Sequence, residues 1–171
     1  RMANVIDVAA PMMTDQMLAL SLRIMEQYEF QLGDAFYSKM LPFVREFTKL
    51  MDRNHTAAFA ETMVSMGNLG VKDEEYWTIC KDKLLKQGYE RYVPLRNVGY
   101  LIKALANVGQ ADPEILRVLG AQVIKHQAGL KSENLEAAIA GFEQAGVGAA
   151  NFKKALADGQ NESKTAPLSL H

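Results

Sequence analysis

One predicted helix carries side chains suited to contact a single-stranded nucleic acid. Its exposed face presents, at spacings of three and four residues, Arg96, Tyr100, Lys103 and Asn107. A cation binds phosphate, an aromatic ring stacks on a base, and an amide forms hydrogen bonds with a base edge. This pattern predicts an RNA-contacting stripe, although a solvated helix face has the same composition. The stripe does not recur at the offset 133 − 96 = 37, because the positions there hold Glu133, Ala137, Ala140 and Gln144.

Further basic residues extend the candidate RNA surface along the chain. One predicted helix carries Lys81, Lys83 and Lys86 on a single face, and later segments add Arg117, Lys125, Lys131, Lys153 and Lys154. Together they predict a discontinuous phosphate-binding edge. The alternative is the solubilising lysine face that amphipathic helices commonly carry.

Helix start and stop signals divide most of the chain into helices. Thr14, Asp73, Asp112 and Ser132 are typical N-cap residues, Pro113 suits a first helical turn, and Gly88 suits a helix end. The predicted helices cover about 14–30, 34–53, 55–68, 73–87, 94–107, 112–127, 132–144 and 149–157. Pro42 should kink or split the second of these near Met40. No segment alternates with a period of two, so the chain is predicted to be all-α.

The predicted helices recur as pairs. The offset 112 − 73 = 39 relates Asp73 to Asp112 and also Gly70 to Gly109, and the offset 146 − 109 = 37 leads on to Gly146. Apolar positions map onto one another in the sets Phe59, Val98 and Leu135; Met63, Ile102 and Ile139; and Met66, Leu105 and Phe142. A single helix pair cannot bury the side that would face a neighbouring pair. The pattern therefore predicts an α-solenoid of stacked helical hairpins with about 37–39 residues per repeat. An ordinary helical bundle with accidental similarity is the alternative.

Three regions follow from this pattern. We expect an extended N-terminal arm over residues 1–13, a helical-repeat domain over 14–157 and a mobile polar tail over 158–171. The arm is apolar, and methionines are concentrated in the first half of the chain. Because thioether side chains adapt to varied partners, we expect a protein-docking surface at Met12, Met13 and Met17.

No group of residues indicates catalysis, a metal or a cofactor. The histidines are isolated from one another and from Cys80, and no metal-ligand spacing occurs. Cys80 maps by the repeat onto Leu119 and Leu156, so we expect it to be buried and unreactive. The sequence therefore predicts a protein that is not an enzyme and that takes no cofactor, metal ion or small-molecule substrate.

The overall composition is that of an ordinary globular chain. Hydrophobic residues make up 49%, charged residues 23%, and the formal net charge is −1, so a polyanion surface would have to come from local clustering. A single cysteine favours a reducing compartment. No apolar run approaches the roughly 20 residues that span a bilayer, so membrane insertion is not expected. Because the chain begins with Arg1-Met2, we expect a processed form or a fragment.

Two segments support a family resemblance. LRNVGYLIKALANVGQADPEIL and SENLEAAIAGFEQAGVGAANF resemble organellar helical-repeat proteins of the octotricopeptide-repeat and FAST-kinase-like, RAP-family type. The shared pattern is a small-residue-rich first helix with leucine and alanine, a terminal glycine and an acidic or proline-containing cap. It is carried by Asn97, Leu101, Ala104, Leu105, Gly109 and Asp112, and again by Asn134, Ala138, Gly141, Phe142 and Gly146. The resemblance covers about residues 55–157.

The resemblance implies an RNA-binding factor in a mitochondrial ribonucleoprotein that processes, edits, stabilises or translates transcripts. The alternative is a scaffold subunit of a large organellar complex that binds only protein, which agrees with the near-neutral charge and the apolar arm. The expected partners are therefore single-stranded RNA, protein subunits of a complex, or both. The expected location is the mitochondrial matrix.

Overall fold

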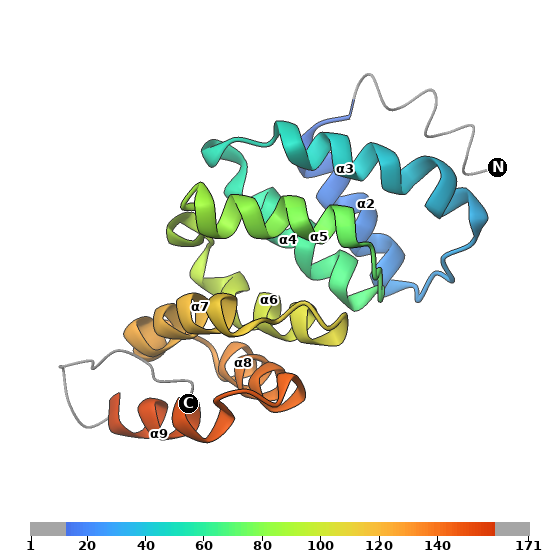
Figure 1. The fold of residues 1–171 in the computed structure, drawn as a ribbon. Coiled ribbons are helices and arrows are strands. Elements are labelled where there is room, and N and C mark those ends of the chain that lie inside the picture. Colours follow the sequence, from blue (N-terminus) through green and yellow to red (C-terminus); the bar gives the residue numbers. More distant parts are fainter. Residues whose placement is uncertain (1–12, 160–171) are drawn as a thin grey trace.

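The structure is a computed structural model that describes residues 13–159, and within them it is all-helical with no strand. The predicted all-α class is confirmed. Figure 1 shows the helix pairs following one another from the N-terminal to the C-terminal end of the molecule. No helix in this part of the chain is long and apolar enough to cross a membrane.

Each pair consists of a first and a second helix. The first helices are α2 (Asp15–Gln27), α4 (Thr56–Asn68), α6 (Leu95–Asn107) and α8 (Ser132–Ala145). The second helices are α3 (Leu41–Leu50), α5 (Glu74–Lys81), α7 (Pro113–His126) and α9 (Ala149–Gly159). Short 3-10 turns lie at Arg53–His55, Tyr89–Tyr92 and Gln127–Gly129.

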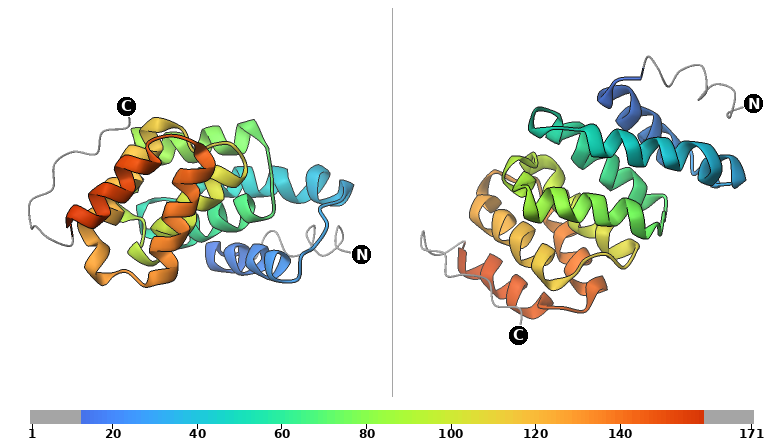
Figure 2. Two further views of the ribbon diagram at one scale, coloured as in Figure 1. Left: turned by 90° about the horizontal axis from the view of Figure 1, so that it is seen from below. Right: turned by 45° about the horizontal axis from the view of Figure 1, so that its top comes forward.

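The first helices lie side by side in chain order. Helix α2 packs on α4, α4 on α6, and α6 on α8. Among the second helices, α3 contacts α5 and α7 contacts α9, so first and second helices form two layers (Figures 1 and 2). The seam between the layers buries the large side chains Phe59, Tyr76, Trp77, Phe142 and Phe152.

The turns between paired helices recur in the same conformation. Gly70, Gly109 and Gly146 have φ angles of 74°, 73° and 69°, a left-handed region that suits glycine. The hydrogen bond from Val71 N to Met66 O (3.0 Å) recurs in the next pair, from Gln110 N to Leu105 O (2.8 Å). The glycine correspondence read from the sequence is therefore also a correspondence of backbone geometry.

Most predicted caps are confirmed, and one is wrong. The side chains of Thr14, Asp73 and Asp112 each accept a hydrogen bond from the backbone N–H three residues later. Ser132 is not an N-cap, because α8 begins at Ser132 itself and Lys131 occupies the cap position without a side-chain bond. The side chain of Asn134 is bonded to α6, and this contact favours the earlier start.

Two second helices contain π-helical turns. The turn Phe36–Met40 runs into α3 just before Pro42, where the sequence predicted a kink or a split. Proline lacks an N–H and crowds the preceding turn, which explains the wider winding there. A second π turn, Asp82–Lys86, follows α5, and Gly88 with φ 74° ends that segment as predicted.

The predicted boundaries differ from the structure at both ends. Of the predicted arm, only Met13 lies among the described residues, and it is half-buried against the core. Helix α9 continues to Gly159, so the first two residues of the predicted tail, Asp158 and Gly159, are helical. Residues 1–12 and 160–171 lie outside the described part of the chain.

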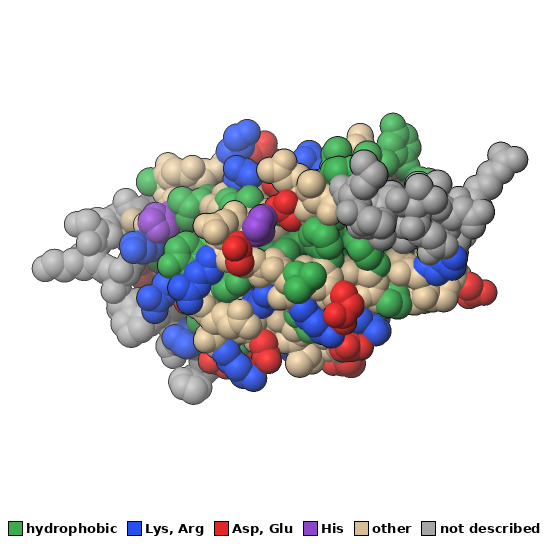
Figure 3. Space-filling model, turned by 90° about the horizontal axis from the view of Figure 1, so that it is seen from above, with side chains coloured by type: hydrophobic (Ala, Val, Ile, Leu, Met, Phe, Trp, Pro, Cys, Tyr) green, Lys and Arg blue, Asp and Glu red, His purple; other side chains and the backbone are tan. Residues whose placement is uncertain are grey.

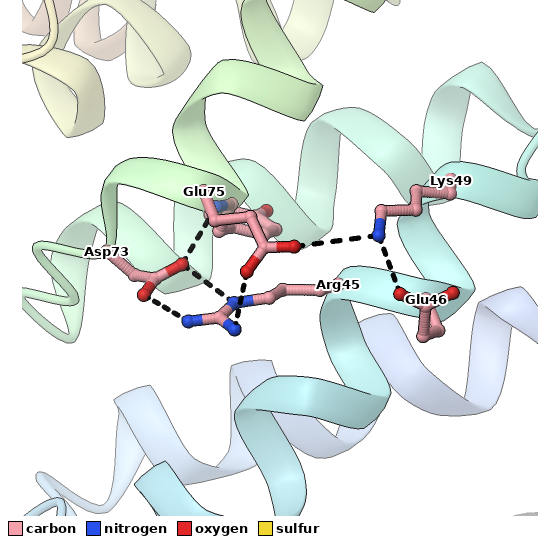
Figure 4. A network of polar contacts seen from close by, with 6 residues as sticks. Arg45, Glu46, Lys49, Asp73 and Glu75 are labelled. Carbon is pink, nitrogen blue, oxygen red and sulfur yellow. Dashed lines mark hydrogen bonds and ion pairs between the residues drawn. The ribbon is translucent and has the colours of Figure 1, made fainter.

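Ion pairs join successive second helices. Arg45 on α3 bonds through two nitrogens to the carboxylate of Asp73, the N-cap of α5, and lies 2.7 Å from Glu75 Oε2 (Figure 4). Lys49 bridges Glu46 and Glu75 at the edge of this network (Figure 4). One pair further along, Lys81 Nζ lies 3.0 Å from Oδ2 of Asp112, the N-cap of α7. A cation on one second helix thus holds the N-cap of the next.

Candidate functional site

An open groove crosses the layer of first helices. It has a volume of about 860 Å³ and is lined from α2, α4 and α6 and from the segment leading into α8. Its charged lining residues are Arg23, Glu26, Glu61, Arg96 and Lys131. Its apolar and aromatic lining includes Val64, Leu95, Tyr100 and Leu130. The groove therefore combines charged and apolar side chains from several successive helix pairs.

The carboxylates of the groove are engaged within the protein. Glu26 accepts hydrogen bonds from Ser65 Oγ (2.9 Å) and Asn68 Nδ2 (2.7 Å), which tie α2 to α4. Glu61 Oε1 lies 3.3 Å from Arg96 Nη2, which ties α4 to α6. Two of the cations have fewer polar contacts. Arg23 and Lys131 are exposed and have no polar side-chain partner among residues 13–159.

Two asparagines that line the groove lie in successive first helices, 37 residues apart (134 − 97 = 37). Asn134 is buried, donates to the carbonyls of Leu95 (3.1 Å) and Arg96 (2.6 Å), and accepts from Gly99 N (2.9 Å). All of its side-chain polar atoms therefore serve the contact between α6 and α8. Asn97 is also buried, but its Nδ2 has no hydrogen-bond partner within the described chain.

The structure places the predicted RNA-contacting stripe on the outer side of α6. Arg96 and Tyr100 line the groove, and Lys103 is exposed one turn further along. Asn107 is half-buried and donates from Nδ2 to Asn68 Oδ1 (3.2 Å), so its amide is used between helices. The four residues share one helix side as predicted, but only two of them line the groove.

The other predicted RNA-contacting residues lie elsewhere. Arg117 and Lys125 are exposed on α7, in the second-helix layer, and neither lines the groove. The structure therefore does not gather the six predicted residues at one place. Figure 3 shows both basic and acidic side chains on the face that it presents, mixed toward the right of the view and mostly basic toward the left.

The predicted basic face at Lys81, Lys83 and Lys86 is wrong. Lys81 pairs with Asp112, and Lys86 Nζ lies 2.8 Å from Asp82 Oδ1. Lys83 is buried, and its Nζ donates to the carbonyl of Met51 (2.7 Å) and lies 5.0 Å from the centre of the Tyr89 ring. Burial lowers the pKa of the Lys83 ammonium. Lys81 ends α5, whereas Lys83 and Lys86 lie in the π turn Asp82–Lys86, so the three do not follow one another on a regular helix.

Cys80 lies in the core between the layers and is fully buried. Burial raises the pKa of its thiol to about 12, so the group is protonated near neutral pH. The predicted burial of Cys80 is confirmed. Within residues 13–159 no three His, Cys, Asp or Glu side chains gather in a way that would hold a metal ion.

Of the predicted docking methionines, Met13 and Met17 lie at the N-terminal end of the described helices. Met12 lies outside the described residues, Met13 is half-buried, and Met17 is 47% exposed on α2. The structure adds Leu20 (57% exposed) and Ile24 (43% exposed) on the same side of α2. Sequence reasoning missed both, although a signal was present. Helix α2 has apolar residues on more than one side, namely Met17, Leu18, Leu20, Leu22, Ile24 and Met25.

The groove residues Arg23, Glu61 and Lys131 were also missed as a group, because each is a single charge on a different helix or loop. Only the lateral packing of α2, α4, α6 and α8 brings them to one surface.

A search of protein-family models and of curated protein sequences finds no match to this chain.

Proposed function

We propose that this protein is a non-catalytic scaffold, an α-solenoid of stacked helical hairpins, that binds another protein within a larger assembly. The observation that carries the proposal is the exposed apolar stripe of α2, defined by Met17, Leu20 and Ile24. It lies apart from the buried side of that helix, which holds Leu18 and Leu22. An apolar stripe at the end of a helical stack is suited to pack against a helix of a partner.

The order of the helices supports the solenoid. Helices α4 and α6 each use one side to pack on the preceding first helix and the other side to pack on the next. Helix α2 is the first of the described series and has only one such neighbour, α4. A partner helix packed on the α2 stripe would continue the same lateral arrangement.

The experiment is a pull-down with the tagged protein after RNase treatment, comparing wild type with the double variant Leu20→Glu/Ile24→Glu. We expect recovery of a defined partner that survives RNase and is lost in the double variant. The matched control is Leu50→Glu, because Leu50 is 81% exposed at the end of α3 and lies outside the stripe. Equal loss in both variants, or no partner at any stage, would reject the scaffold proposal.

Single-stranded RNA is the second candidate ligand. The observation that favours it is the exposed ring of Tyr100, which lies on the same side of α6 as the cations Arg96 and Lys103. The resemblance of residues 55–157 to organellar repeat proteins supports the same ligand and a mitochondrial location. Recovery of a partner that RNase abolishes, with loss in Arg96→Glu/Lys103→Glu, would favour RNA over protein.

A further inference from the structure

We propose that the groove across the first helices holds an extended, acidic peptide segment of the partner. This inference rests on the proposed scaffold function and specifies the chemistry of what is bound. The groove spans the stack from Arg23 on α2, through Arg96 on α6, to Lys131 at the start of α8. Its cations therefore stand at both ends and near the middle of the path that a bound chain would follow.

The charges of the groove favour a ligand whose negatively charged groups are separated by uncharged residues. Glu26 is held by Ser65 and Asn68, whereas Arg23 and Lys131 have no side-chain partner in the described chain. Arg96 is 69% exposed at its side chain and has a single contact at 3.3 Å with Glu61. Carboxylates of a ligand can pair directly with Arg23 and Lys131, and with Arg96 beside its longer contact to Glu61.

The remaining lining favours a peptide over a nucleic acid. A nucleic acid carries a charge at every nucleotide and would meet Glu26 and Glu61 along the way. A peptide can place its carboxylates opposite the cations alone and set apolar side chains against Leu95, Leu130 and Tyr100.

The stack also sets the spacing of the acidic residues. Packed helices lie about 8–10 Å apart, and an extended chain rises about 3.3 Å per residue. Arg23 and Arg96 belong to first helices two steps apart, which corresponds to about six peptide residues. Arg96 and Lys131 are one step apart, which corresponds to about three. A segment with acidic residues at positions 1, 7 and 10 fits this arrangement.

The test uses a fluorescein-labelled ten-residue peptide with glutamate at positions 1, 7 and 10 and with serine and leucine alternating elsewhere. Binding to the full chain is measured by fluorescence anisotropy at low ionic strength. We expect the peptide in which glutamine replaces glutamate to bind at least tenfold more weakly. The double variant Arg23→Glu/Lys131→Glu should lose at least tenfold in affinity for the acidic peptide.

The matched control is Arg117→Glu/Lys125→Glu, which makes the same charge change on α7, outside the groove. It should keep the affinity within twofold, and circular dichroism should show that both double variants are folded. The inference is overturned by equal loss in both variants, by no binding of the acidic peptide, or by tighter binding of a ten-nucleotide oligouridine that the groove variant abolishes.

Failure of this inference can be separated from failure of the scaffold proposal. A partner that depends on Leu20 and Ile24, together with no peptide binding, would reject the groove ligand and retain the scaffold. Groove-dependent peptide binding with no RNase-resistant partner would support the groove ligand and reject the role proposed for the α2 stripe.

Discussion

Lys83 and Gln122 make equivalent hydrogen bonds in successive helix pairs, 39 residues apart (122 − 83 = 39). Lys83 Nζ donates to the carbonyl of Met51 (2.7 Å), and Gln122 Nε2 donates to the carbonyl of Glu90 (2.5 Å). The two acceptors are separated by the same offset (90 − 51 = 39), and both lie in the link between one helix pair and the next. A second helix thus ties down the preceding link in two successive repeats, with a lysine in one and a glutamine in the other.

The two bonds should differ in their contribution to stability. Met51 O keeps a second donor, Tyr89 Oη at 3.2 Å, and Lys83→Met also removes a buried cation whose desolvation is costly. Gln122→Met removes the side-chain donor of Glu90 O, which should cost about 1 kcal/mol. In urea unfolding we therefore expect Lys83→Met to be neutral or stabilising and Gln122→Met to be destabilising. If Lys83→Met were the more destabilising of the two, the second donor of Met51 O would not compensate for the loss of Lys83.

The N-caps Asp73 and Asp112 provide a second matched pair. Each carboxylate accepts a hydrogen bond from a backbone N–H and pairs with a cation. The Asp73–Arg45 pair is the more buried one, because its side chains are 18% and 24% exposed, whereas those of Asp112 and Lys81 are 38% and 28% exposed. Burial raises the pKa of the Asp73 carboxyl, and the hydrogen bonds from Arg45 and Tyr76 N outweigh it, so the net shift is downward.

Asp73→Asn keeps a capping side chain but loses the charge that Arg45 binds, so we expect a loss of about 1 kcal/mol in the free energy of unfolding at pH 7. Asp112→Asn should cost less, because its ion pair is more exposed. Since the pKa of Asp73 is lowered in the folded state, its contribution is present above the unfolded pKa and is lost as the pH falls through the folded pKa. Equal losses for the two variants at pH 7, or no decline at acid pH in the stability difference between Asp73→Asn and wild type, would count against this.

The features predicted from the sequence are those that near neighbours determine. The caps at Thr14, Asp73 and Asp112 depend on a side chain and a backbone N–H three residues away, and Gly70 and Gly109 depend on the local φ angle. These local signals determine where a helix ends independently of its tertiary contacts. The all-α class followed from them together with the helical period of the apolar residues.

The features that escaped prediction depend on packing between repeats. The sequence predicts Lys83 on an exposed basic face, either phosphate-binding or solubilising, because a regular helix would expose it. In the structure Lys83 lies in a π turn and is buried, with its Nζ bonded to the Met51 carbonyl. Its equivalence to Gln122 was available as a signal, since both flank core residues at the same repeat position. The groove depends on Arg23, Glu61 and Lys131, whose approach is decided only by how closely α2, α4, α6 and α8 pack.

Gly99 shows how close that packing is. A Cβ atom added to it would overlap the backbone oxygen of Asn134, and Gly99 N donates to Asn134 Oδ1 (2.9 Å). Gly99→Ala must push α8 away from α6, so we expect a loss of about 3 kcal/mol or more in the free energy of unfolding. Gly33→Ala is the control, because a Cβ there meets nothing within 4 Å. Similar unfolding midpoints for both variants would show that α6 and α8 are not in this contact in solution.

Cys80 gives a prediction at alkaline pH. Burial raises the pKa of its thiol from 9.0 to about 12 in the folded protein, so the unfolded chain loses this proton first as the pH rises. Between these values the unfolded state is favoured by up to about 1.4 kcal/mol for each pH unit. Cys80→Ala lacks this linkage but adds a constant cavity cost. We therefore expect the stability advantage of wild type over Cys80→Ala in urea unfolding to be constant below pH 8 and to shrink steadily above pH 9. Parallel pH profiles would mean that the thiol is not buried from solvent in the folded protein.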